Sequence, residues 1–459
     1  MLIHCIRPVR ALLASLVLAM CAACGGGNSS VTTYSGDGLG NVTAGTTVAL
    51  DTPTGINTTE VIVDAGPPSF SLGTVANVPY VTVTVCSPIA GPCVTIDRIF
   101  LDTGSYGLRV LKSSVAGLSL PPVTLAANPQ LNTSAGVALE CYPFVLGGIW
   151  GPLARADVRM AGETATAIPI QVIDDTAGAA LTAPADCVTA AGGTLFSSAA
   201  ALQANGILGI GMMRFDCGVA CAAGDYSGFH IQYYVCPDSV TAHCQAAAVP
   251  ADMQTQNPVA HFVASDNNPQ PDNNGSILSL PALPTLGAAI AKGRLVFGIG
   301  TRSNNQISPT AKMLMVDNDP ASPSYLYFTT TLGQARFSDS YIDSGSNAYF
   351  FNDASISLNC KSSSGTTVQG GWYCPAGTAS AMRSATLTDL HGNSAPVEFS
   401  IANSDLLFSG SSAAFNNLGG SINQAPQTFV WGLSFFFGRS VYTSIWGQAL
   451  SLNGPWNAF

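Results

Sequence analysis

Short apolar runs that alternate with polar residues fill the chain from about residue 78 onward. Val78–Val85 alternates with a period of two, which places successive side chains on opposite faces of a strand. A second strand is expected over Val94–Leu101. Further strands of this β-branched and aromatic character are expected at Ala156–Met160, Ile168–Ile173, Leu295–Ile299 and Tyr325–Thr330. Long amphipathic helical patterns are scarce, so the pattern predicts an all-β protein of many short strands with short helices.

The composition agrees with this pattern and narrows the choice of partners. The 459 residues allow two or three domains, or one large β body with two lobes, and the 47 glycines and 28 prolines indicate frequent turns. Charged residues make up 9% of the chain, against about 25% in an ordinary protein. The net charge of -10 repels phosphate backbones, so we expect no nucleic-acid partner.

The first residues have the pattern of an export signal. Two arginines precede the short apolar run Ala11–Met20, which cannot span a bilayer alone, and two alanines precede Cys24. This predicts a lipoprotein signal peptide over residues 1–23 and lipidation at Cys24, although Cys21 stands where such signals usually carry Leu. Simple secretion is the alternative. Because Gly25 and not Asp follows Cys24, we expect an outer-membrane lipoprotein that faces the periplasm or the cell surface.

Ten cysteines follow Cys24, and an even number in an exported chain predicts disulfides. The nearest neighbours give the pairs Cys86–Cys93, Cys236–Cys244 and Cys360–Cys374. The alternative is a zinc site, and its spacings match no common zinc pattern. Its ligands would be Cys217, Cys221, Cys236, His243 and Cys244.

A weak internal repeat divides the chain into halves. Ile99–Ser105 ends in Asp-Thr-Gly-Ser and is followed about a hundred residues later by the apolar segment Gly206–Gly211. Ser340–Ser346 contains Asp-Ser-Gly-Ser and is followed at a similar distance by Phe429–Leu433. Each half therefore contains an apolar strand, an aspartate turn and an apolar-apolar-Gly element.

The aspartates of these turns, Asp102 and Asp343, are the candidate catalytic residues. Two carboxylates about 3 Å apart cannot both ionise, so they share one proton and can act together as base and acid on water and a peptide carbonyl. This chemistry needs no metal and no cofactor, and we expect neither. The glycines permit tight turns, and the hydroxyls can hydrogen-bond to the carboxylates. These supporting residues are Thr103, Gly104, Ser105, Ser344, Gly345 and Ser346.

The paired motifs resemble those of the pepsin superfamily, in which each lobe contributes one Asp-Thr/Ser-Gly. Asn205–Gly209 resembles the Asp-Gly-Ile-Leu-Gly segment of that family's first lobe, with Asn in place of Asp. Tyr142 matches the flap tyrosine, with a flap tip near Cys141–Phe144, although Pro143 replaces the glycine that follows it. The resemblance implies an all-β, bilobed pepsin-like aspartic protease fold. The chain as a whole also resembles a family of uncharacterised proteobacterial lipoproteins, through its Cys-Gly-Gly-Gly start (24–27), Asp-Ser-Gly-Ser-Asn (343–347) and Phe-Phe-Phe-Gly-Arg (435–439).

These observations give one favoured function and one rival. After the signal peptide we expect a flexible tether (24–75), an N-terminal β lobe (76–290) with a disulfide-rich surface insertion at about 212–276, and a C-terminal β lobe (291–459). The favoured hypothesis is a lipid-anchored, monomeric aspartic endopeptidase that acts on an extended peptide or protein substrate. The rival is a non-catalytic envelope binding lipoprotein of the same fold. The hydroxyls around the aspartates favour an activity optimum below about pH 6.

Overall fold

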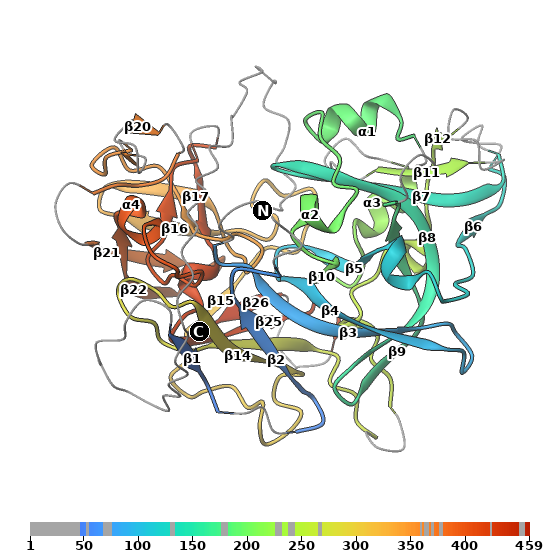
Figure 1. Ribbon diagram of the computed structural model, residues 1–459, viewed down its shortest axis with the longest axis horizontal. Coiled ribbons are helices and arrows are strands. Elements are labelled where there is room, and N and C mark those ends of the chain that lie inside the picture. The colour runs from blue at the N-terminus through green and yellow to red at the C-terminus, as the bar shows by residue number, and fades with distance from the viewer. Residues whose placement is uncertain are drawn as a thin grey trace. The chain divides into compact units, whose positions relative to one another are not determined.

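The structure is a computed structural model, and it describes most of the chain from residue 46 to residue 459 (Figure 1). The described residues are 46–51, 55–67, 76–128, 134–175, 182–224, 232–236, 244–264, 269–358, 360–361, 367–368, 371–375, 380–422, 425–448 and 455–459. The predicted signal peptide and Cys24 lie outside them. No helix within the described residues is long and apolar enough to cross a bilayer.

Two compact units make up the described chain. The first contains Val81–Asn273, and the second contains Asn274–Phe459 together with the described residues up to Tyr80. Strands dominate both units, and the longest α-helices have six residues. The predicted β-rich class with short helices is confirmed.

The first unit contains a fully buried strand, β10, which lies between β4 and β5. Its elements are β3 (Pro79–Cys86, whose first two residues belong to the second unit), β4 (Cys93–Asp102), β5 (Tyr106–Leu111), η2 (Lys112–Val115), β6 (Thr124–Leu125), β7 (Gly136–Phe144), β8 (Gly147–Met160), β9 (Glu163–Ile173), α1 (Ala185–Ala190), α2 (Ala199–Leu202), β10 (Gly206–Ile210), α3 (Gly218–Ala223), β11 (Gln232–Cys236), β12 (Gln245–Ala246), η4 (Ala251–Met253) and η5 (Val259–His261). The strands follow one another in the order β3–β8–β9–β5–β10–β4. The long strand β8 also pairs with β7, which in turn pairs with β6 and β11.

The unbroken apolar sequence of β10 explains why this strand is buried on both faces. All five residues of Gly206–Ile210 are buried, and the last four of β4, Ile99–Asp102, are buried as well. A strand buried on both faces shows an unbroken apolar run and not an alternating one. Asp102 therefore lies at the end of β4, in the part of the strand that is buried.

The second unit contains two larger sheets and one small one. Its elements are β1 (Thr47–Ala49), β2 (Thr58–Val63), β13 (Gly275–Leu280), β14 (Ile290–Phe297), β15 (Met313–Met315), β16 (Phe328–Leu332), β17 (Ala335–Ile342), β18 (Tyr349–Phe350), β19 (Cys360–Lys361), β20 (Thr367–Val368), β21 (Ser380–Thr388), β22 (Ser394–Ala402), α4 (Ser404–Phe408), β23 (Gly419–Gly420), β24 (Thr428–Trp431), η6 (Leu433–Phe435), β25 (Arg439–Ser444) and β26 (Trp456–Ala458). One sheet has the order β22-β21-β16-β17-β24-β18-β23. In the other, β14 pairs with β1, β2 and β13, and β13 leads through β25 and β26 to β15.

Stacked aromatic rings form the core of the seven-stranded sheet. The ring of Phe429 stacks on Phe351 and on Trp431, with centroid distances of 4.6 and 4.5 Å. The indole nitrogen of Trp431 donates to Thr330 Oγ1 at 3.0 Å, so this buried polar group is satisfied. Aromatic pairs contribute about 0.5–1.5 kcal/mol beyond the area they bury. They fix the position of β24, which pairs in parallel with β17, the strand that leads to Asp343.

Five disulfides are present among the described residues, and the three predicted pairs are confirmed. The structure adds Cys141–Cys187 and Cys217–Cys221. The four cysteines of the alternative zinc site are all bonded in disulfides, so their sulfurs are not free thiolates. His243, its fifth expected ligand, lies outside the described residues.

Two local expectations differ from the structure. The segment 212–276 was expected at the surface, but β11 pairs with β7, and Asp216, Thr255 and Asn257 are buried. These polar side chains are buried because they have hydrogen-bond partners, which the sequence cannot show. The strand expected at Tyr325–Thr330 begins at Phe328 and extends to Leu332. Leu326, with a φ of 61°, adopts the left-handed conformation and not an extended one.

Candidate functional site

Asp102 ends β4 and accepts hydrogen bonds from its own turn. The amide of Gly104 donates to Oδ1 at 2.8 Å, and the hydroxyl of Ser105 donates to Oδ2 at 2.7 Å. Asp102 is fully buried, as is Ser105, and Thr103 is 6% exposed. A buried carboxylate needs such donors because it has lost its hydration.

Asp343 directly follows β17 and has the same arrangement. Gly345 N donates to Oδ1 at 2.7 Å, and Ser346 Oγ donates to Oδ2 at 2.6 Å. Asp343, Ser344 and Ser346 are fully buried. Both candidate aspartates thus have the same two donor types at nearly equal distances.

The strands around the two turns repeat as well. In the first unit β10 runs parallel to β4 and antiparallel to β5. In the second unit β24 runs parallel to β17 and antiparallel to β18. The internal repeat seen in the sequence is therefore a repeated trio of strands, with an aspartate turn between the outer two.

The glycine of each apolar-apolar-Gly element lies level with an aspartate. Gly209 is the partner of Asp102 in the parallel ladder, and Gly432 follows Trp431, the partner of Ile342. A Cβ on Gly209 would lie 2.7 Å from Ser105 Oγ, and one on Gly432 would lie 2.1 Å from a backbone oxygen. Both glycines are needed because the aspartate turns pack directly against them.

The predicted flap is a β-hairpin formed by β7 and β8. Its two-residue turn is Val145–Leu146, and both side chains are about half exposed. The tip therefore lies beyond the expected Cys141–Phe144 segment, all four residues of which belong to β7. Tyr142 lies in that strand with only 3% of its surface exposed.

A buried ion cluster beside Tyr142 was not anticipated from the sequence. Arg109 Nη2 donates to Glu140 Oε1 at 2.6 Å and to Asp216 Oδ1 at 2.8 Å, and all three side chains are fully inaccessible. The guanidinium carbon of Arg109 lies 3.8 Å from the centre of the Tyr142 ring. One signal could have revealed the cluster: Arg109 and Glu140 each interrupt an apolar run in a chain that has few charges.

The buried surroundings of the cluster shift the pKa of Asp216 and that of Arg109. Burial raises the pKa of Asp216 well above its ordinary value, and the charge of Glu140 adds to this against the opposing charge of Arg109. Burial alone would lower the pKa of Arg109, but the charges of Asp216 and Glu140 raise it overall. The cluster therefore keeps its guanidinium charged and favours a proton on Asp216.

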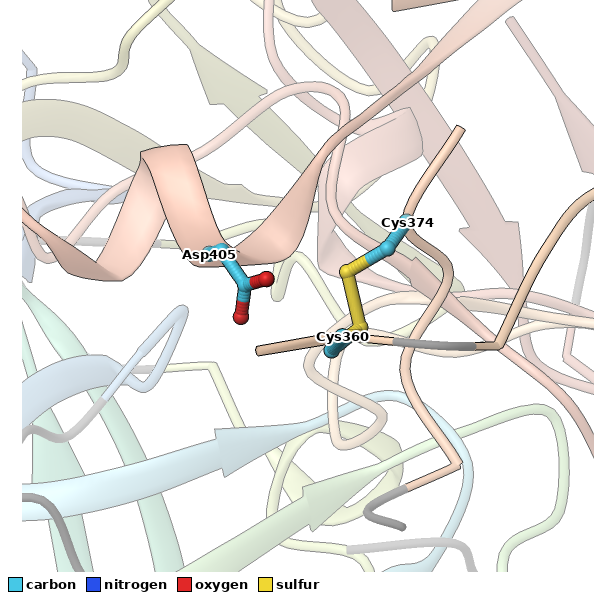
Figure 2. A group of neighbouring side chains, drawn as sticks. All are labelled: Cys360, Cys374 and Asp405. Carbon is cyan, nitrogen blue, oxygen red and sulfur yellow. A yellow bond between two sulfur atoms is a disulfide. The ribbon is translucent and has the colours of Figure 1, made fainter. Parts of the chain in front are cut away.

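One group of side chains has the composition of a metal site, and Figure 2 shows it. Cys360, Cys374 and Asp405 have ligand atoms within 4.8 Å of one another. The two cysteines form a disulfide, so their sulfurs are not thiolates that could bind an ion. The Asp405 amide donates to Asn403 Oδ1, which caps α4. The group is a disulfide beside a helix start.

Fold and site define a class: a β-rich, disulfide-bonded protein with an aspartate turn in each of two repeated strand trios. The chain belongs to the family described as "Protein of unknown function (DUF3443)", which it matches over residues 53–459. A search of curated proteins finds no match.

Proposed function

We propose that the protein is an aspartic endopeptidase, anchored by lipid at Cys24 to the outer membrane, in which Asp102 and Asp343 share one proton. In this proposal the two compact units are the two lobes of a pepsin-like fold. One observation supports it above the others: each aspartate has one glycine amide and one serine hydroxyl as donors, within 0.1 Å of the same distances.

These donors leave each carboxylate held in place by its own turn. Gly104 and Gly345 bind one oxygen, and Ser105 and Ser346 bind the other. A carboxylate fixed in this way keeps its orientation while its protonation changes. That is the requirement for a residue that alternates between acid and base.

The proposed reaction needs only the pair and one water. The ionised carboxylate takes a proton from water, whose oxygen bonds to the peptide carbonyl carbon, while the protonated carboxyl gives its proton to the carbonyl oxygen. The resulting diol then loses a hydroxyl proton to the ionised carboxylate. The other carboxyl protonates the amide nitrogen, and the carbon–nitrogen bond breaks. The pair ends with one proton, as it began.

An extended peptide fits the β architecture as substrate. Strand addition supplies main-chain hydrogen bonds to a peptide of any sequence, and exposed apolar side chains add selectivity. Val145 and Leu146, at the tip of the β7–β8 hairpin, offer such side chains.

One observation favours the binding protein as a second candidate. The β7 strand is bonded to α1 through Cys141–Cys187 and is paired on its other side with β11. A hairpin held at these points has less freedom to open and close during turnover. It is well suited to hold a ligand.

The experiment measures cleavage of denatured casein by the full chain purified in detergent. Rates are measured from about pH 3 to about pH 8, because the expected pH profile of cleavage is bell-shaped with its maximum below about pH 6. Asp102→Asn and Asp343→Asn are each expected to abolish cleavage, because an amide cannot exchange the proton. Loss by a factor of about 10³ or more is expected for a residue that acts in the chemical step.

Asp64→Asn is the matched control. Asp64 accepts a hydrogen bond from Gly66 N at 2.9 Å, as Asp102 does from Gly104, but lies half-exposed outside the repeated trios. Its variant should cleave like the unaltered protein. Cleavage that survives in Asp102→Asn or Asp343→Asn contradicts the mechanism. Casein bound but never cleaved by the unaltered protein supports the binding protein.

A further inference from the structure

The cluster of Arg109, Glu140 and Asp216 joins segments that are distant in sequence. Arg109 lies on β5, Glu140 lies on β7, and Asp216 follows β10. Through Nη1, Arg109 also donates to the carbonyl of Tyr106 at 2.6 Å. Tyr106 is the first residue after Ser105, so a single guanidinium links the Asp102 turn to the hairpin.

A second layer of hydrogen bonds closes around the carboxylates. Tyr233 OH donates to Asp216 Oδ2 at 2.9 Å, and Thr255 Oγ1 donates to Glu140 Oε2 at 2.6 Å. The amide of Thr255 donates to Tyr233 OH at 3.0 Å. Tyr233 and Thr255 both belong to the 212–276 segment. This segment therefore stabilises the β7–β8 hairpin through hydrogen bonds to the buried cluster, and we call Asp216, Tyr233 and Thr255 the brace.

The ring of Tyr142 lies over one face of the guanidinium. Glu140 and Tyr142 are two apart on β7, so their side chains leave the same face of the strand. Arg109 thus contacts a carboxylate and a ring from one strand, with the guanidinium carbon 3.8 Å from the ring centre.

We propose that Arg109 is a positioning residue that fixes the β7–β8 hairpin, with Tyr142, relative to the strand that leaves the Asp102 turn. The role in substrate handling rests on the proposed function, whereas the fixing of the hairpin does not. The brace of Asp216, Tyr233 and Thr255 acts with Arg109 in this role.

A gain in folding stability does not by itself explain why the protein buries these three charged residues. A buried ion triad is often no more stabilising than apolar residues of the same volume, because each ion loses its hydration. What an apolar replacement cannot supply is the fork, in which one planar group reaches Tyr106, Glu140 and Asp216 at once. This geometry fixes the distances between the segments that carry these three residues.

Amide hydrogen exchange of the full chain tests the fixing directly. Arg109→Lys keeps the charge but loses the fork, and Tyr233→Phe keeps the Arg109–Glu140 pair but removes the hydroxyl that bonds to Asp216 and to the amide of Thr255. Both should speed exchange over Gly136–Trp150 by about tenfold or more, since local opening sets this rate. The β21–β22 hairpin is the internal reference and should not change. Tyr233→Phe decides the matter if Arg109→Lys does not fold.

Arg383→Lys is the matched control, because Arg383 also pairs with an aspartate, Asp353, at 3.2 Å but lies in the second unit. It should leave the β7–β8 exchange unchanged. The proposal is overturned if the exchange of the β7–β8 hairpin stays unchanged in both variants. It is also overturned if exchange becomes faster throughout the protein, because that would show a general loss of stability and not the release of one hairpin.

Casein cleavage by the same variants tests the consequence for the substrate. We expect KM to rise about tenfold with kcat within about twofold of the unaltered protein, because the hairpin contacts substrate while the aspartate turns stay intact. A fall in kcat at constant KM would contradict this role. If the unaltered protein does not cleave casein, the proposed function fails, and the exchange experiment still decides whether Arg109 fixes the hairpin.

Discussion

At the scale of single residues, the two aspartates depend on neighbours three positions away. Ser105 and Ser346 each donate to Oδ2 of the aspartate in their own turn. Hydrogen bonds to an ionised carboxylate stabilise that form over the neutral one. In the proposed enzyme they extend the acidic range in which one carboxylate of the pair stays ionised.

Replacing both serines with alanine should therefore move the activity profile toward neutral pH. In Ser105→Ala/Ser346→Ala we expect the maximum of casein cleavage to shift upward by about one pH unit, which corresponds to about 1.4 kcal/mol. Ser113→Ala is the control, because Ser113 donates to the carboxylate of Asp175 at an exposed site. A maximum that stays in place in the double variant would show that the hydroxyls do not set the profile.

Glycine is also required by packing at single positions. Ala at Gly209 would place its Cβ 2.6 Å from Tyr106 N and 2.7 Å from Ser105 Oγ. We expect Gly209→Ala to lower the free energy of unfolding by about 1–3 kcal/mol, measured by urea titration. Gly117→Ala, where no atom lies within 4 Å of the new Cβ, should stay within about 0.5 kcal/mol. Equal stability of the two variants would contradict the close packing.

At the scale of elements, the 212–276 segment shows how tertiary contacts override local pattern. Its polar residues and turns predict a surface loop, yet β11 pairs with β7 over five residues and Tyr233 is fully buried. Burial of this polar segment is possible because Arg109 and Glu140, over a hundred residues away from parts of it, supply its partners. No local pattern encodes a partner at that separation.

The raised pKa of Asp216 predicts a pH dependence of folding. Burial first, and then the charge of Glu140, raise the pKa of Asp216 against the charge of Arg109, so the folded state keeps a proton that the unfolded chain releases above about pH 4. The retained proton adds fully to the free energy of unfolding at lower pH. As pH rises, this stabilisation decreases by about 1.4 kcal/mol per pH unit until the raised pKa of Asp216 is passed. Asp216→Asn should flatten this decrease in urea titrations between about pH 4 and 8.

Asp353→Asn serves as the control of opposite sign. Partial burial opposes the shift, but hydrogen bonds from Ser355 and the charge of Arg383 lower the pKa of Asp353 overall. Its contribution is therefore lost as pH falls, and its variant should change only the acidic side of the stability profile. An unaltered slope above pH 4 in Asp216→Asn would show that Asp216 does not retain the proton.

At the scale of the whole molecule, the chain carries one strand trio with an aspartate turn in each of its two compact units. One family model matches residues 53–459, so the family includes both units. The proposed anchor precedes this region. A tether between membrane and catalytic region would keep the enzyme at the envelope while its substrate diffuses.

Anchoring makes a prediction for the complete protein. The chain expressed with its own signal should partition into the detergent phase of Triton extracts, and Cys24→Ala should move it to the aqueous phase, because the acyl chains supply the membrane affinity. Cys21→Ala should still partition into detergent, because the prediction places the acyl chains on Cys24 and not on the nearby Cys21. A protein that is released into the aqueous phase without any substitution would contradict lipidation.

The sequence by itself determined the β-rich class, three of the five disulfides and the two aspartate turns, because strand alternation, turn glycines and short cysteine spacings are local properties. Tertiary structure alone decided the Cys141–Cys187 and Cys217–Cys221 bonds, the course of the 212–276 segment and the Arg109 cluster. Chain packing sets which distant groups meet in the interior, and a buried charge is stable only where a partner from elsewhere in the chain reaches it. For Arg109 those partners are 31 and 107 residues away.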